Sequence, residues 1–216
     1  MESKYVLTRS GDDLFSVAVD SPADAQALAA RLREAADWVE VIPGIASVVL
    51  RFDAASQSSD AMQHTLEDVM ASDVPALPIS DRLVEIPVVY GGRYGPDLDA
   101  VSHAIGLSPE EIIAAHAAGE YTVDMLGFTP GFAFIGGLDD RFRIPRRQEP
   151  RQRVAAGSVG IADGRTGLYA MASPGGWNII GRTSYPLFKP DDEDPFVLSA
   201  GMRVRFKAVA AEEFGE

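Results

Sequence analysis

The sequence predicts an α+β fold in two domains: a ferredoxin-like domain over residues 1–82, followed by a β-barrel over residues 83–216. Two observations support this prediction. Over roughly the first 80 residues, segments with strand and helix patterns alternate. After Tyr121, short apolar runs alternate instead with Gly, Pro and Asp turns, which is typical of a closed or nearly closed barrel.

In the N-terminal domain, alternating or β-branched runs predict strands, and apolar residues at helical spacing predict helices. Ser21 is placed to cap the first helix, Pro22 takes its first position, and Leu28, Leu32 and Val39 recur on one face. Two helices on one face of a small antiparallel sheet account for this order. The predicted elements are strands at Leu14–Val19, Ile45–Phe52 and Val84–Tyr90 and helices at residues 21–39 and Asp60–Met70.

A helical pair is expected at the start of the second domain. Asp97 opens the first helix and Gly106 ends it, while Ser108 and Glu111 form a capping box for the next one. The barrel strands are predicted at Thr122–Leu126, Phe132–Ile135, Ser158–Ile161, Gly167–Met171, Asn178–Ile180 and Met202–Phe206.

The composition excludes several classes of function. Because the formal net charge is −13, general nucleic-acid binding is not expected, and a small anionic ligand fits the one short basic segment better. No apolar stretch is long enough to span a bilayer and no signal peptide is evident, so we expect a cytoplasmic protein. With no cysteine and only the widely separated His64, His103 and His116, no metal site is predicted.

Arginine is concentrated in one segment of this acidic chain. Residues 141–153 hold six of the nineteen basic residues. Guanidinium groups match a carboxylate or phosphate, so the segment is a candidate anion site. The alternative is that these arginines pair with Asp139, Asp140 and Glu149 on a solvated loop.

Glycine-rich turns flank this segment. In the run from Ser173 to Trp177, exposed N–H groups beside Gly175 and Gly176 could cradle an oxyanion, or the run could be a plain turn between strands. It lacks the length and the lysine of a P-loop, and Ser158 lacks the context of a hydrolase nucleophile. His116, near the end of a helix, could serve in acid/base work or in a structural role.

Several strings, taken in order, resemble the family of the B component of 5-oxoprolinase, also called KipI-like or allophanate hydrolase subunit 1. They are YGGRYGPDLDAV, GLSPEEII, YTVDMLGFTPGFAFIGGLD, IPRRQEPR, AAGSVGIADGRTGLY, SPGGWNIIGRT and GMRVRF. The resemblance implies that the barrel is cyclophilin-like and pairs with a related barrel in the C component of the enzyme. It also implies a separate A component, and a complex that uses ATP to open the ring of 5-oxo-L-proline to L-glutamate, with this chain inactive alone.

The resemblance also implies roles for individual residues. The residues expected to act in catalysis are His116, Asp97 and Arg182. The residues expected to bind the anionic lactam or amide substrate, or to wall its pocket, are Arg146, Arg147, Arg151, Arg165, Thr166, Gly175, Gly176, Trp177 and Thr183. Which component of the complex binds ATP is left open.

Three positions depart from the usual family pattern: Ala155 replaces Pro, Arg165 replaces Gln, and Ala170 replaces Pro. An arginine in place of an amide changes charge and donor pattern, so the substrate could be a different lactam, amide or carboxylate. Two other functions stay open. One is a KipI-type inhibitor of a sensor histidine kinase, and the other is a carboxyltransferase-like protein that processes urea or an amide.

Overall fold

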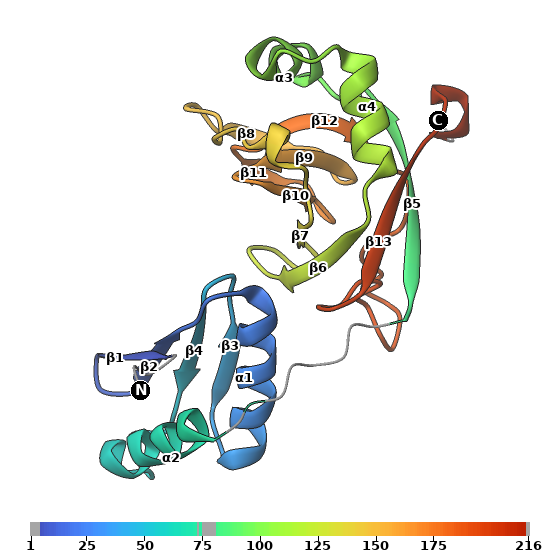
Figure 1. Cartoon of the computed structure of the whole chain (residues 1–216). Coiled ribbons are helices and arrows are strands. Elements are labelled where there is room, and N and C mark those ends of the chain that lie inside the picture. The colour runs from blue at the N-terminus through green and yellow to red at the C-terminus, as the bar shows by residue number, and fades with distance from the viewer. Residues whose placement is uncertain (1–4, 73, 75–80, 215–216) are drawn as a thin grey trace. The chain divides into compact units, whose positions relative to one another are not determined.

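The computed structural model describes residues 5–72, 74 and 81–214. The chain divides into two compact units, Met1–Pro78 and Ile79–Glu216. Figure 1 labels the elements of both. The elements of the first unit are β1 (Val6–Ser10), β2 (Leu14–Ala18), α1 (Pro22–Ala35), β3 (Glu40–Pro43), β4 (Ser47–Arg51) and α2 (Ser59–Ala71).

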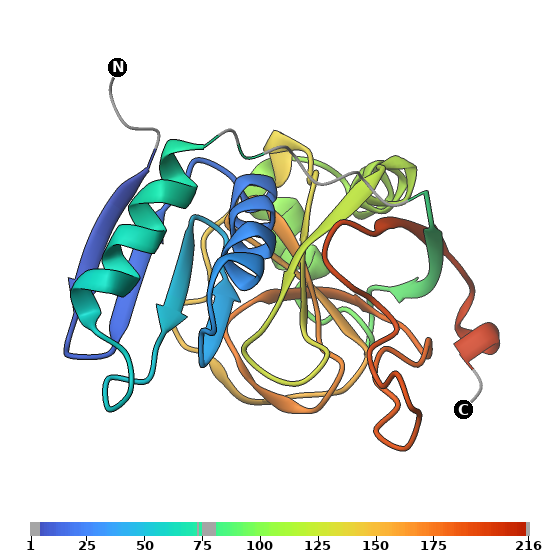
Figure 2. The same ribbon diagram turned by 90° about the horizontal axis from the view of Figure 1, so that it is seen from below.

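The first unit is a four-stranded antiparallel sheet, in the order β1-β2-β4-β3, with one covered face. Both helices lie on this face (Figure 2). Phe15 and Leu50 from the sheet pack there with Leu28 of α1 and Leu66 of α2, and all four side chains are fully buried. The predicted two-layer arrangement is therefore present.

The ferredoxin-like order is not confirmed. That order is βαββαβ, with the fourth strand after the second helix. Here the elements follow the order ββαββα. The sheet also has four strands, but the additional one is β1, which comes first in the chain and is joined to β2 by a tight hairpin. The strand predicted at Val84–Tyr90, which follows the predicted domain boundary at residue 82, is β5 of the second unit and adds no strand to this sheet.

The first helix is shorter than predicted. Ser21 caps it as expected, with its hydroxyl accepting from the N–H of Asp24. The helix ends at Ala35 because Ala36 is extended, and Trp38 Nε1 donates to the carbonyl of Leu32. Val39 consequently lies outside the helix and is 46% exposed.

The second unit is built on a closed barrel of seven strands in the order β10-β7-β6-β13-β5-β12-β9. Among the strands that the structure describes, only the β13–β5 pair is parallel, and Figure 1 shows these two strands side by side. The strands of this unit are β5 (Leu83–Tyr90), β6 (Tyr121–Leu126), β7 (Ala133–Gly136), β8 (Arg151–Val154), β9 (Ser158–Ala162), β10 (Arg165–Leu168), β11 (Ser173–Gly175), β12 (Asn178–Arg182) and β13 (Arg203–Ala208). The two strands outside the barrel, β8 and β11, pair with each other.

The helical pair is as predicted, with α3 at Leu98–Ile105 and α4 at Pro109–Ala118. Gly106 ends α3 in the left-handed conformation, and the capping box of Ser108 and Glu111 is complete. Both helices pack on barrel strands, α3 on β12 and α4 on β13. Short 3₁₀ turns at Asp140–Phe142 and Ala211–Phe214 complete the unit.

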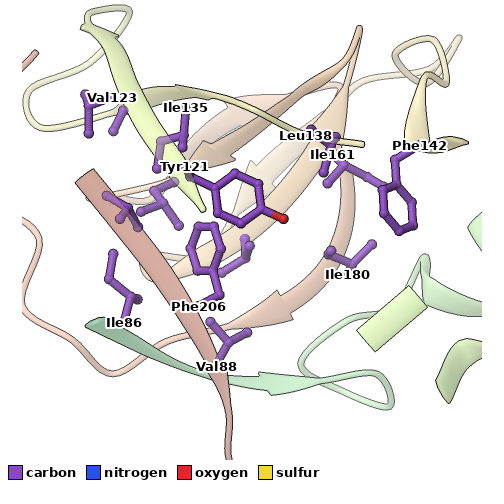
Figure 3. Close-up of a cluster of buried hydrophobic side chains, with 14 of the residues drawn as sticks. Ile86, Val88, Tyr121, Val123, Ile135, Leu138, Phe142, Ile161, Ile180 and Phe206 are labelled. Atoms are coloured by element: carbon purple, nitrogen blue, oxygen red, sulfur yellow. The ribbon is translucent and has the colours of Figure 1, made fainter. Parts of the chain in front are cut away.

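The barrel interior is filled by apolar side chains. Figure 3 shows Ile86 and Val88 of β5 meeting there with Tyr121 of β6, Ile135 of β7 and Phe206 of β13. The barrel is thus a packed core, and sites have to lie on its surface.

Gly95 marks a close approach of two backbones beside this core. Its N–H donates to the carbonyl of Gly91, and a Cβ added at Gly95 would overlap the carbonyl oxygen of Ile180. We predict that Gly95→Ala lowers the free energy of unfolding by about 3 kcal/mol, because backbone cannot yield as a side chain can. Gly176→Ala is the matched control, since the nearest atom to its added Cβ is 3.7 Å away. Urea denaturation that shows equal stability for the two variants would contradict this account.

Candidate functional site

A buried carboxylate organises the arginine segment. Asp97 precedes α3 and is only 3% exposed. Arg147 Nη1 donates to its Oδ1 at 2.9 Å, and Arg151 donates through both Nη atoms at 2.8 Å. The N–H of Ile179 on β12 donates to Oδ2 at 2.7 Å. Every hydrogen bond here is charge-assisted, so the cluster is held firmly.

Two of the predicted anion ligands are therefore already engaged. Arg147 and Arg151 are 34% and 27% exposed, and the bond to Asp97 raises the pKa of Arg151. The predicted surface pairing of the whole segment does not hold for these two residues. Asp97, expected from the sequence to act in catalysis, instead positions both guanidinium groups.

An aromatic pocket lies beside this cluster. The backbone N–H of Arg147 donates to the carbonyl of Gly176 at 2.7 Å, and β8 pairs with β11, so the arginine segment and the run to Trp177 are joined. The pocket has a volume of about 270 Å³. It is lined by Phe128, Phe132, Phe134, Arg146, Pro150, Tyr169, Pro174, Gly175, Gly176 and Trp177.

Arg146 is the cation of this pocket. Its guanidinium lies 5.7 Å from the centre of the Trp177 ring, and its Nε is 3.2 Å from a carboxylate oxygen of Asp163. Both partners of that ion pair are 57% exposed. An exposed pair of this kind contributes about 0–1 kcal/mol, so Arg146 can exchange Asp163 for an incoming anion at little cost.

Phe128 forms part of the rim in an unusual conformation. Its φ is 72°, and its side chain is 68% exposed while its ring contacts Phe132 edge to face. A bulky residue in the left-handed region is strained, and such strain concentrates at binding sites.

A larger groove lies on the other side of Arg146. Its volume is about 620 Å³. It is lined by Ala100, Val101, Ala104, Ile105, Leu107, Arg141, Arg143, Ile144, Pro145, Arg146 and Asn178. The lining combines apolar residues of α3 and its C-terminal end with three arginines.

His116 is enclosed in the barrel unit. It is 1% exposed, Nδ1 is 2.7 Å from the hydroxyl of Tyr90, and Nε2 is 3.0 Å from the hydroxyl of Thr166. Burial lowers the pKa of His116 to about 3. This position gives His116 a structural role, in which the neutral ring stacks on Phe206.

The other predicted residues lie apart from the aromatic pocket or differ from expectation. Arg165 pairs with Asp124 at 2.9 Å. Arg182 donates to the carbonyl of Ala156, and it lines a different cavity together with Thr183. Gly175 lies in strand β11, so the predicted Gly-Gly turn is a strand end in the structure.

Phe128, Phe132 and Tyr169 line the pocket but were not singled out from the sequence as site residues. Burial raises the pKa of the Tyr169 phenol and outweighs the nearby charges of Arg146 and Arg151, which lower it. The cluster of phenylalanines on either side of Pro130 was the signal that could have identified the first two.

Comparison with known proteins matches both units of the chain to one family. The profile of the carboxyltransferase domain, subdomain C and D, matches residues 4–198. The B component of 5-oxoprolinase from Escherichia coli O157:H7 is 45% identical over 181 residues, covering 83% of this chain and 82% of that protein. That of Bacillus subtilis is 40% identical over 187 residues, covering 82% and 78%. The chain belongs to the family of the 5-oxoprolinase B component.

A solved structure agrees. The protein TTHA0988 is 34% identical with a TM-score of 0.75, and the match covers 92% of this chain. The chain spans only 40% of the length of TTHA0988.

Within the described ranges, no helix is long and apolar enough to cross a membrane, and no group of three or more His, Cys, Asp or Glu could hold a metal ion.

Removal of the Asp97 carboxylate should destabilise this family member. We predict that Asp97→Ala costs about 3 kcal/mol in the free energy of unfolding, the lower end of the range for a broken buried pair, because both arginines keep some contact with water. Asp163→Asn, which breaks an exposed pair and tolerates the left-handed φ of 51°, should cost less than about 1 kcal/mol. Denaturant midpoints that fall equally in the two variants would argue against a central role for Asp97.

The low pKa of His116 predicts a pH effect on stability. The unfolded imidazole takes up a proton below about pH 6.5, but the folded one stays neutral down to about pH 3. The unfolded state therefore binds more protons as the pH falls through this range, and stability drops by about 1.4 kcal/mol per pH unit. Between pH 7 and pH 5, the wild type should lose about 2 kcal/mol more than His116→Gln. The exposed His103→Gln is the control, and identical pH profiles for all three proteins would refute the assignment.

Proposed function

We propose that this chain is the B component of an ATP-dependent 5-oxoprolinase, a cytoplasmic complex that also needs the A and C components and in which this chain is inactive alone. The observation that carries the proposal is 40–45% identity over most of the chain to proteins that bear the name of this component. Such a name belongs to one part of a larger complex. We infer that the partner is the C component, which contains a related barrel.

The aromatic pocket suits a small ring that carries a carboxylate. Its volume of about 270 Å³ lies just below the roughly 300–1,000 Å³ of pockets for drug-sized ligands. The rings of Phe128, which is 68% exposed, and Trp177 can pack against the ring of 5-oxoproline, and Arg146 can pair with its carboxylate. The Asp97 cluster supports this wall from behind, because Arg147 is bonded both to Asp97 and to Gly176.

The proposed chemistry begins with activation of the lactam, which is a poor electrophile. The lactam oxygen attacks the γ-phosphorus of ATP, the bond to the β-phosphate oxygen breaks, and ADP leaves with the electron pair. Water then adds at the former carbonyl carbon, and the C–N bond breaks as the nitrogen takes a proton, which leaves an acyl phosphate. A second water displaces phosphate to give L-glutamate. Guanidinium groups stabilise the negative charge that develops on oxygen during these steps.

The arginines have different roles within this scheme. Arg146 binds the substrate, while Arg147 and Arg151 add positive potential and are positioned by Asp97. His116 moves no proton at the reacting atoms, because its ring is only 1% exposed and is enclosed in the barrel unit between Tyr90 and Thr166.

Reconstitution with the A and C components tests the function. We predict ATP-dependent loss of 5-oxoproline, and a KM for 5-oxoproline that rises at least tenfold in Arg146→Ala, because a charge-assisted hydrogen bond contributes about 1.5–3 kcal/mol. Arg205→Ala is the matched control, since Arg205 forms a similarly exposed pair with Glu120 on the barrel surface.

Absence of activity with all three components folded and associated would contradict the proposal. Such a result would favour the regulatory alternative, in which the chain inhibits a sensor histidine kinase.

A further inference from the structure

The feature that leads further is the position of Arg146 between two cavities. Arg146 lines both the aromatic pocket and the larger groove next to α3. The two cavities differ in chemistry and size, since the first is aromatic and about 270 Å³ and the second is about 620 Å³ and is lined by apolar side chains and three arginines. Two different ligands that react with each other need such an arrangement.

We propose that the groove binds the nucleoside triphosphate, and that its γ-phosphate reaches the lactam oxygen next to Arg146, whose guanidinium pairs with the substrate carboxylate. This inference rests on the proposed function, because that reaction requires a nucleotide beside the lactam. It assigns the nucleotide to this chain, with the base in the groove and the phosphates along Arg141 and Arg143.

Size and surface chemistry favour this occupant. A volume of about 620 Å³ falls within the range of sites for drug-sized ligands, whereas the aromatic pocket is too small for a nucleotide. Ala100 and Ala104, one helical turn apart on α3, leave a low apolar surface against which a flat base can lie. Ile144 and Pro145 supply a second apolar wall.

Asn178 adds a polar group to this groove. Its Nδ2 donates to the carbonyls of Pro145 and Ile161 at 3.0 and 3.1 Å. These two bonds orient the amide, so that its oxygen can serve as an acceptor for a donor group of the base.

The rim can supply positive charge at small cost. Arg141 and Arg143 pair with Asp139 and Asp140 at 2.8 and 3.2 Å, and the two guanidinium side chains are 58% and 72% exposed. The single contact of Arg143 with Asp140 contributes about 0–1 kcal/mol, so its exchange for the more highly charged phosphates is favourable. Arg141 is held bidentately by Asp139 and adds positive charge beside Arg143. The arginines also bind phosphate oxygens bidentately, which a lysine could not do.

The groove is held in shape by contacts that do not involve the rim arginines. The N–H of Asp163, in the turn after β9, donates to the carbonyl of Ile144 at 2.8 Å. The 3₁₀ turn Asp140–Phe142 fixes the other end, with Phe142 buried in the barrel core. Substitution of a rim arginine should therefore leave the fold intact.

Calorimetric titration of Mg·ATP into the full chain, alone and in complex with the A and C components, tests the inference. Two variants change the groove. Arg143→Ala removes a proposed phosphate ligand, and Ala104→Glu places a negative charge on the α3 side of the groove. Arg205→Ala is the matched control. We expect the Kd for Mg·ATP to rise about tenfold in both groove variants and to stay unchanged in the control.

The opposite results overturn the inference. Equal affinity in all four proteins, or no Mg·ATP binding by the wild type both alone and in the complex, would place the nucleotide elsewhere. Loss of assembly with the C component in Ala104→Glu, with ATP affinity unchanged, would make the groove a protein interface instead. Because these are binding measurements, they test the nucleotide site even if the complex shows no 5-oxoprolinase activity. That lack of activity would contradict the proposed function, so the two failures can be told apart.

Discussion

The carboxylate of Asp97 is the contact on which the rest of the site depends. It joins the start of α3 to the arginine segment and to β12, whose contacting residues Arg147 and Ile179 lie 50 and 82 residues further along the chain. Arg147 continues from this carboxylate to Gly176 through its backbone, and Arg151 pairs in register with Gly175. The wall of the aromatic pocket is therefore fixed by one buried anion. Arg146, next in the chain to Arg147, is left on the surface, where it can face both cavities.

Much of the fold could be predicted from local signals. The capping box at Ser108, the left-handed Gly106 and the apolar runs of the barrel are all visible in short windows of sequence, and each was found in the structure. The strands β1 and β3 were missed because both are short and neither contains a buried residue, so their sequences show no clear apolar pattern. The order of the N-terminal sheet could not be predicted either, because strand pairing is a long-range property that a window does not contain.

The site was predictable in composition but not in detail. The unusual concentration of arginine and the nearby Trp177 indicated the segment that borders the aromatic pocket in the structure. Burial then separates the arginines by role: Arg147 and Arg151 are held by Asp97, whereas Arg146 is exposed. Neighbouring residues in the sequence suggested surface pairing, and only the fold brings Asp97 beside them. In the same way, the enclosed ring of His116 shows that a helix-end histidine can be structural.

The central claim is that the aromatic pocket holds the ring substrate against Arg146. Fluorescence emission from Trp177 tests this claim most directly. Trp38 is the only other tryptophan in the sequence, so a Trp38→Phe chain reports on Trp177 alone. Titration with 5-oxoproline, with and without the A and C components, should give a saturable change in emission that is lost in Arg146→Ala. A titration without any saturable change, or one that Arg146→Ala leaves intact, would contradict the account.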